Sequence, residues 1–187
     1  MKEGVKMRFY YKRLAKKISM SNTRPDYTGR RVTRSLKEVK FIVIHYTGGT
    51  KDTCVNECDY FATGNDRHAG ANFFVDRMGH IGRSIPMKYI AYHCGGGIQG
   101  TEEGSAKYHN ICTNYNSVGI ELCAIADKLA STPQIEATNR LVKYIRRKCP
   151  NATVIIRHWD VTGKDCPHLY KGVNNEDWNY LKAQISA

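Results

Sequence analysis

The sequence lacks a long apolar segment. None of its 187 residues lies in a run of about 18 consecutive apolar residues, the length that a membrane helix requires. The first 20 residues are basic, but they contain no apolar run of roughly 7 to 15 residues such as a signal peptide has. We therefore expect synthesis in a cytoplasm, without export by the general secretion route.

The sequence also lacks the even number of cysteines that complete pairing into disulfides would require. Seven cysteines in a chain with no recognisable export signal make a disulfide framework a poor interpretation, so most should be reduced. Cys123 and Cys149 are typical, because their neighbours favour buried core thiols. Cys166 differs, since it stands in a segment with other chemistry-bearing residues.

The folded body has little net charge. Residues 1–40 hold 13 Lys and Arg against 3 Asp and Glu, whereas residues 41–187 hold 16 against 14. A nucleic-acid-binding domain should carry positive charge on its folded body, so we expect no nucleic-acid partner. The basic segment suits an anionic polymer or a membrane surface. Alternatively, it is a solvated tail that packs a residue or two against the sheet.

The length bounds the domain organisation. A chain of 187 residues with 41% hydrophobic content can bury one substantial core but not two. We expect a basic N-terminal extension over residues 1–38 and one catalytic domain over residues 39–187. Residues 9–18 could form a short basic amphipathic helix within the extension.

Strand-like and helix-like segments alternate after residue 38. Residues 94–116 are rich in Gly, Asn, Thr and Ser and predict a long surface loop of a kind that is commonly functional. The alternation predicts an α/β fold, a single domain with a central mixed β-sheet flanked by helices. The expected strands are 39–45, 71–76, 80–85, 118–125 and 152–156, and the expected helices are 51–63, 133–149 and 175–185.

Three residues have the side chains of a metal site. His45 and His158 each end a predicted buried strand, and Cys166 follows His158 by eight residues. Two imidazoles and one thiolate leave a tetrahedral zinc with one open position, which is typical of a catalytic site. A single strand-end histidine is more often a hydrogen-bonded structural residue. The three together predict one zinc ion per chain.

Four short motifs carry a family resemblance. In order they are Ile-His45-Tyr-Thr-Gly, Asn-Ser-Val-Gly-Ile-Glu121, Arg-His158 and Lys164-Asp-Cys166-Pro. Together they resemble the zinc-dependent N-acetylmuramoyl-L-alanine amidases of type 2, a family that includes amidase-type phage lysozymes and peptidoglycan recognition proteins. The likeness spans about residues 38–185. It implies zinc ligation by His45, His158 and Cys166, catalytic roles for Glu121 and Lys164, and bacterial peptidoglycan as the partner.

Two segments depart from the family pattern. Members often carry Tyr or His in the strand that here reads Gly-Ala-Asn72-Phe, and some use that residue in catalysis or substrate contact, so Asn72 is a candidate substrate contact. The common Trp-His-Ala-Gly segment reads Tyr-His93-Cys-Gly here. His93 is therefore a candidate substrate contact and not a metal ligand. A purely structural histidine is the alternative.

The residue types also suit amide hydrolysis. A carboxylate beside the attacking water can take its proton and pass it to the leaving nitrogen, and Glu121 suits this role. The ammonium of Lys164 can bind the developing negative charge. We predict hydrolysis of the amide joining N-acetylmuramic acid to L-alanine, by a phage endolysin that acts on the wall after release. The alternative is a non-catalytic peptidoglycan-binding module, which the presence of Cys166 disfavours.

Overall fold

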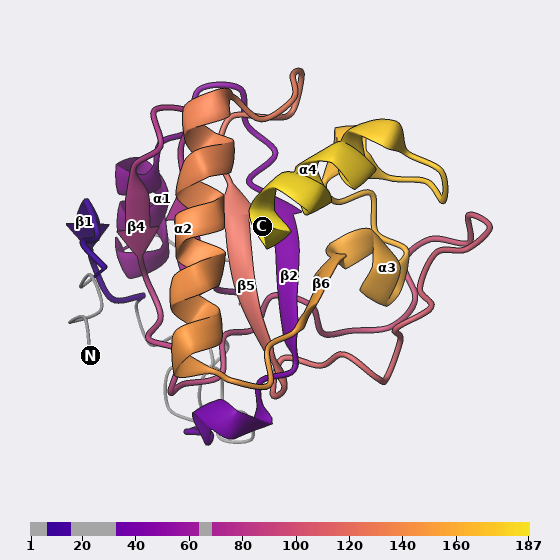
Figure 1. The fold of residues 1–187 in the computed structure, drawn as a ribbon, viewed down its shortest axis with the longest axis horizontal. Helices are drawn as coiled ribbons and strands as arrows, with labels where there is room; N and C mark the ends of the chain where they lie inside the picture. The colour runs from indigo at the N-terminus through magenta and orange to yellow at the C-terminus, as the bar shows by residue number, and fades with distance from the viewer. Residues whose placement is uncertain (1–6, 16–32, 64–68) are drawn as a thin grey trace.

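Six strands form one sheet in the computed structural model, which describes residues 7–15, 33–63 and 69–187. The strand order is β1-β4-β3-β5-β2-β6, and only β3 and β4 pair antiparallel. The sheet is therefore mixed, with helices packed against both of its faces (Figure 1). The α/β prediction is confirmed. The strands are β1 (Tyr11–Lys12), β2 (Phe41–Tyr46), β3 (Phe73–Val75), β4 (Ile81–Arg83), β5 (Ser117–Leu122) and β6 (Val154–Arg157).

The described residues also form four α-helices and two 3-10 turns, of which η1, α1 and α2 lie between strands and the others follow β6. Ser131 caps the longest helix, α2, by accepting a hydrogen bond from the amide of Gln134, and Pro133 occupies its first turn. The three helices expected from the sequence are present, each with slightly different ends. The helices are α1 (Cys54–Thr63), α2 (Thr132–Lys148), α3 (His158–Thr162) and α4 (Glu176–Ser186), and the turns are η1 (Leu36–Glu38) and η2 (His168–Tyr170).

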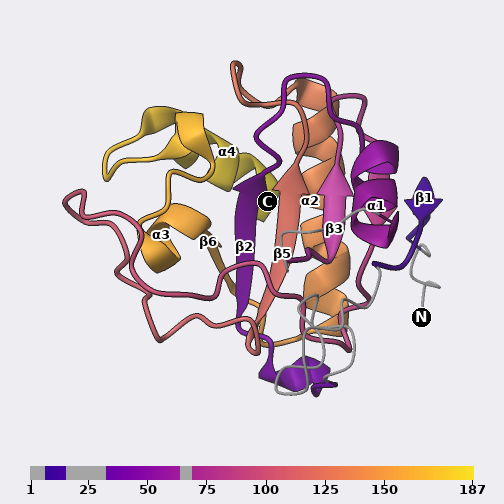
Figure 2. The same ribbon diagram turned by 180° about the vertical axis from the view of Figure 1, so that it is seen from behind.

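The two faces of the sheet bury different clusters. On β2, Ile42 and Ile44 pack in the main core with residues of α2 and α4. Figure 1 shows α2 in front of the sheet, and Figure 2 shows it behind. Because side chains alternate along a strand, Phe41, Val43 and His45 point to the opposite face. Phe41 and Val43 belong to a separate buried cluster there. Both faces of β2 are thus covered, as its continuous apolar sequence predicts.

The prediction of a helix over residues 9–18 is wrong for residues 9–15, the part of that range that the structure describes. Tyr11–Lys12 is a strand that pairs in parallel with β4, and residues 16–18 lie outside the described residues. Tyr11 donates a hydrogen bond to the Asp59 carboxylate on α1, and Arg13 forms an ion pair with the same group. Hydrogen bonding to the edge of β4 therefore stabilises this segment more than a short isolated helix would.

All seven cysteines are buried and free, which agrees with the expectation of reduced thiols. Within the described ranges, no helix is long and apolar enough to cross a membrane.

Candidate metal centre and active site

Strand register brings the first site residues together. His45 on β2 is the direct neighbour of Glu121 on β5, and Ile44 pairs with Arg157 at the end of β6. His158, which follows Arg157, is therefore beside His45. Ligand sites in α/β proteins lie at the carboxyl ends of parallel strands, and these residues share that edge of the sheet.

His158 lies just after β6 and begins a short helix, α3. The carboxylate of Asp160 accepts hydrogen bonds from the backbone amide and guanidinium of Arg157, which closes the first turn of α3. The amide of Trp159 donates to the carbonyl of Cys166 at 2.8 Å, so the segments that carry two of the predicted ligands are joined directly. Five residues are too few for the 3.6-residue period to reveal such a helix in the sequence.

The three predicted ligands converge. His45 Nδ1 lies 3.1 Å from His158 Nδ1, and Cys166 Sγ lies 3.7 Å from His45 Nδ1. One ligand atom from each residue falls within 4.8 Å of the others. In an ideal tetrahedral zinc site the N–N edge is about 3.3 Å and the N–S edge about 3.6 Å, from the usual bond lengths. The donor set and its spacing therefore fit zinc.

Burial sets the protonation of this cluster. Burial first, and then His158, His93 and Lys164, lower the pKa of His45 well below its ordinary value. Burial lowers the pKa of His158 to about 3, with further contributions from Lys164 and His93. Both imidazoles are thus neutral at pH 7 and keep a lone pair for a metal. Burial also raises the pKa of the Cys166 thiol, so its thiolate requires a cation nearby.

One cavity of about 230 Å³ adjoins the cluster. A second cavity of about 480 Å³ lies next to the first, because Tyr46, Thr47 and Glu57 line both cavities. Lys164 lines both cavities, and its side chain is exposed to solvent. The 230 Å³ cavity brings together the predicted site residues His45, His93, Glu121, His158, Lys164 and Cys166.

Asn72 is not brought to this cavity. Its side chain is fully buried, its Nδ2 donates to the Ile85 carbonyl at 3.0 Å, and its Oδ1 accepts from the Gly119 amide at 3.0 Å. The amide thus joins the segments around β3 and β5. A substrate contact by Asn72 stays a prediction.

The site also contains residues that the sequence reasoning did not single out. Ser117 and Gly119 share with Glu121 the face of β5 that carries the site. The period of two along Asn-Ser-Val-Gly-Ile-Glu could have identified them, because residues 117, 119 and 121 must face the same way. Tyr46 and Glu57 line the cavities, but no spacing in the sequence points to them.

Comparison with known sequences agrees with this arrangement. A family model of N-acetylmuramoyl-L-alanine amidases matches residues 35–169, a range that holds all three converging ligands. The chain belongs to this family. A probable N-acetylmuramoyl-L-alanine amidase from Bacillus licheniformis is 31% identical over 138 residues, and the N-acetylmuramoyl-L-alanine amidase CwlL from the same organism is 30% identical over 139. Each match covers 71% of this chain but only 37% of the relative, so the chain spans little more than a third of their length.

Solved structures show the same fold. A mutant endolysin from Bacillus subtilis superimposes with a TM-score of 0.65 at 20% identity, covering 94% of this chain and 97% of that one. The N-acetylmuramoyl-L-alanine amidase LysC from Clostridium intestinale URNW gives a TM-score of 0.56 at 20% identity, covering 87% and 95%. At this identity the likeness establishes the fold of this amidase-family chain and not its chemistry.

Proposed function

We propose that this protein hydrolyses the amide bond between N-acetylmuramic acid and L-alanine in bacterial peptidoglycan, with one zinc ion held by His45, His158 and Cys166. The observation that carries the proposal is the convergence of three buried donors, spaced as in a tetrahedral zinc site, at the wall of a cavity. Membership of the amidase family supports it.

The chain provides the groups that such a hydrolysis needs. When bound, zinc supplies a Lewis acid and lowers the pKa of water. Glu121 lies beside His45 in the sheet and lines the same cavity. Its carboxylate takes the proton of the attacking water and returns it to the leaving nitrogen. The Lys164 ammonium donates hydrogen bonds to the oxygen on which negative charge develops.

The shape of the site suits a polymer. The two cavities share a boundary at Tyr46, Lys164 and Cys166, so a chain-like substrate can extend to either side of the reacting bond. We propose that His93 and the cavity residues near it contact the substrate on one side. In this proposal the protein acts as an endolysin, and its basic residues 1–38 concentrate it on anionic wall polymers or on a membrane surface.

Digestion of purified peptidoglycan tests the reaction. We expect free stem peptides that begin with L-alanine, intact glycan strands, and loss of activity with a chelator. New reducing sugar ends, or new amino groups within the cross-links, would show a different hydrolase. Binding to walls without any release of peptide would favour the non-catalytic module.

A further inference from the structure

The imidazole of His93 lies between a proposed zinc ligand and a buried hydroxyl. His45 Nε2 lies 2.9 Å from His93 Nδ1, and His93 Nε2 lies 3.1 Å from Ser117 Oγ. Ser117 Oγ lies 2.6 Å from the Thr113 carbonyl oxygen. Four groups thus form one continuous hydrogen-bonded chain that starts at the atom of His45 opposite the ligand cluster.

The direction of this chain is fixed at its far end. A carbonyl oxygen only accepts, so the single hydroxyl proton of Ser117 is donated to Thr113. Ser117 Oγ must then accept the Nε2–H of His93, which leaves His93 Nδ1 as an acceptor. His93 Nδ1 in turn accepts the Nε2–H of His45. The proton of His45 is therefore on Nε2, and the lone pair of Nδ1 faces His158 and Cys166.

We propose that His93 and Ser117 are positioning residues that set the tautomer and ring orientation of His45, so that Nδ1 is ready to bind a metal. The inference rests on the proposed zinc site and assigns these two residues a role in it. Partners of this kind hold a ligand imidazole in one tautomer and raise its basicity. This role adds to the proposed substrate contact of His93: both ring nitrogens are engaged by the protein, so the carbon atoms of the ring are what face the cavity and a substrate.

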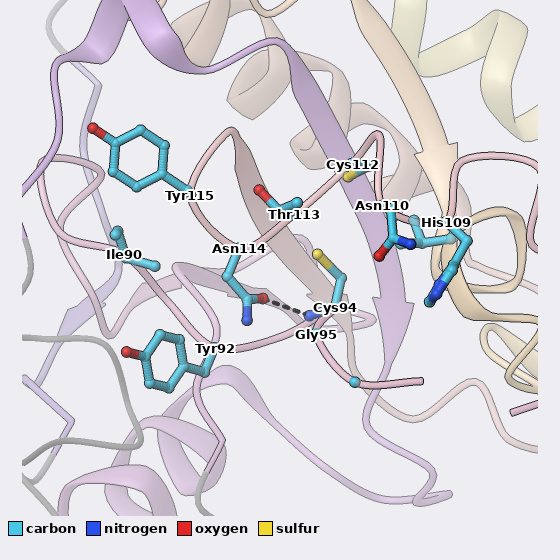
Figure 3. Close-up of a pocket in the computed structure, with 12 residues that line it drawn as sticks. Ile90, Tyr92, Cys94, Gly95, His109, Asn110, Cys112, Thr113, Asn114 and Tyr115 are labelled. Carbon is cyan, nitrogen blue, oxygen red and sulfur yellow. Dashed lines mark hydrogen bonds between the residues drawn. The ribbon is translucent and has the colours of Figure 1, made fainter. Parts of the chain in front are cut away.

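The surrounding structure holds His93 in this place. A Cβ atom at Gly119 would lie 2.7 Å from His93 Cγ, so the ring packs on β5 only because residue 119 is glycine. The side-chain oxygen of Asn114 accepts hydrogen bonds from the backbone amides of His93 and Cys94, each at 2.9 Å. Figure 3 shows the bond from Asn114 to the Cys94 amide. Contacts within the protein therefore hold both the ring and its backbone.

The second proposed imidazole ligand has no such support. The Nε2 atom of His158 is buried and has no hydrogen-bond partner among the residues that the structure describes. The chain therefore reaches His158 only through His45, whose Nδ1 lies 3.1 Å from His158 Nδ1. His80, whose imidazole pairs with Asp76, provides an internal control within each variant.

An isosteric pair of variants tests the chain in the full-length protein. Ser117→Thr keeps the hydroxyl and Ser117→Val removes it, while both add the same bulk at a fully buried position. Zinc affinity is measured by competition with a chromogenic chelator. We expect Ser117→Val to bind zinc more weakly than Ser117→Thr, by up to about 10-fold, since the usual 10- to 100-fold loss applies to the direct partner of a ligand, which is His93.

Nitrogen chemical shifts of the zinc-free protein provide the second measurement. With ¹⁵N-labelled histidine, wild type and Ser117→Thr should show His45 and His93 each as a single Nε2–H tautomer. Ser117→Val should show mixed tautomers at both rings, with the His80 signals unchanged. If the Ser117 variants fail to fold, His93→Asn and His93→Leu form the replacement pair, because the Asn oxygen can accept from His45 and Leu cannot.

Equal zinc affinity and equal tautomers within a pair would overturn the inference. So would a shift of His80 as large as that of His45, because it would indicate general disruption. The proposed function is tested separately by wall digestion. If wild type releases no stem peptide but the zinc affinities and tautomers differ as expected, the proposed function fails and the positioning role stands.

Discussion

Replacement of Arg34 by methionine should destabilise the fold strongly, although Arg34 precedes the predicted catalytic domain. Its guanidinium is buried and donates to four backbone carbonyls, at 2.9 Å to Met87, 3.0 Å to Asn114, 2.8 Å to Tyr115 and 2.5 Å to Ser117. Burial lowers the pKa of Arg34 to about 10, so it remains charged at pH 7. One side chain thus links the segment before η1 to the segment after β4, to the end of the loop over residues 94–116 and to the start of β5.

The magnitude follows from these bonds. Methionine matches the length of arginine but donates nothing, so the carbonyl oxygens lose a charged donor. A buried acceptor left without its partner costs about 1 to 3 kcal/mol, and breaking a buried charged group's contacts costs about 3 to 5 kcal/mol in total. The variant no longer has to bury the guanidinium charge of Arg34, which offsets part of this loss, so we expect the free energy of unfolding to fall by about 4 kcal/mol. For a domain of this size, that corresponds to a fall in Tm of about 10 °C.

Thermal unfolding followed by circular dichroism measures this loss, and Lys37→Met is the matched control. Lys37 lies three residues away in the same segment and is exposed, so its replacement should change Tm by about 1 °C or less. If the folded domain begins at Val39, as the sequence predicts, the two variants should be equally stable. That outcome would refute the stabilising role of Arg34.

Four further predictions concern the site and the basic segment. Cys166→Ser should lose most of the bound zinc and Cys54→Ser should retain it, as metal analysis of the purified proteins will show, because only Cys166 belongs to the ligand cluster. Glu121→Gln should keep its zinc but release stem peptides about 10² to 10⁴ times more slowly, and a normal rate would remove Glu121 from the mechanism. In the zinc-free protein, burial lowers the pKa of His158 from 6.5 to about 3, so the unfolded chain binds a proton that the folded chain excludes. Stability measured in urea should therefore be complete above pH 6.5 and decline as the pH falls toward 3. Neutralising the basic residues among 1–15 with glutamine should weaken wall binding at low salt but not at high salt, whereas equal binding at every salt concentration would reduce the segment to a solvated tail.

The sequence predicted the site best where a proposed metal ligand lies at the end of a strand. The apolar run of β2 identifies a buried strand, and a buried strand can end in a histidine that faces solvent or a cavity. The same reasoning holds for His158 after β6. The third ligand, Cys166, follows from its short distance along the chain to His158. These inferences depend on neighbours in sequence, and they agree with the converging geometry.

The sequence could not predict contacts between distant segments. β1 pairs with β4 across about 70 residues, and the free edge that makes this possible is a property of the folded sheet. The contact of His93 with His45 spans 48 residues and depends on the missing side chain of Gly119. Neither the hydrophobic periodicity nor the spacing of motifs in the sequence indicates such contacts between distant residues. The order of the strands in the sheet is of the same kind.

The converging donors are held by the fold itself. Register fixes His45 beside Glu121, the bond from the Trp159 amide to the Cys166 carbonyl joins the other two ligand segments, and the ring of His93 supports His45. Each of these contacts is made between groups of the protein. The conformational entropy of ordering three side chains is therefore lost on folding and not on metal binding. A metal that enters has mainly to displace the thiol proton of Cys166, which makes its binding depend on pH more than on rearrangement of the chain.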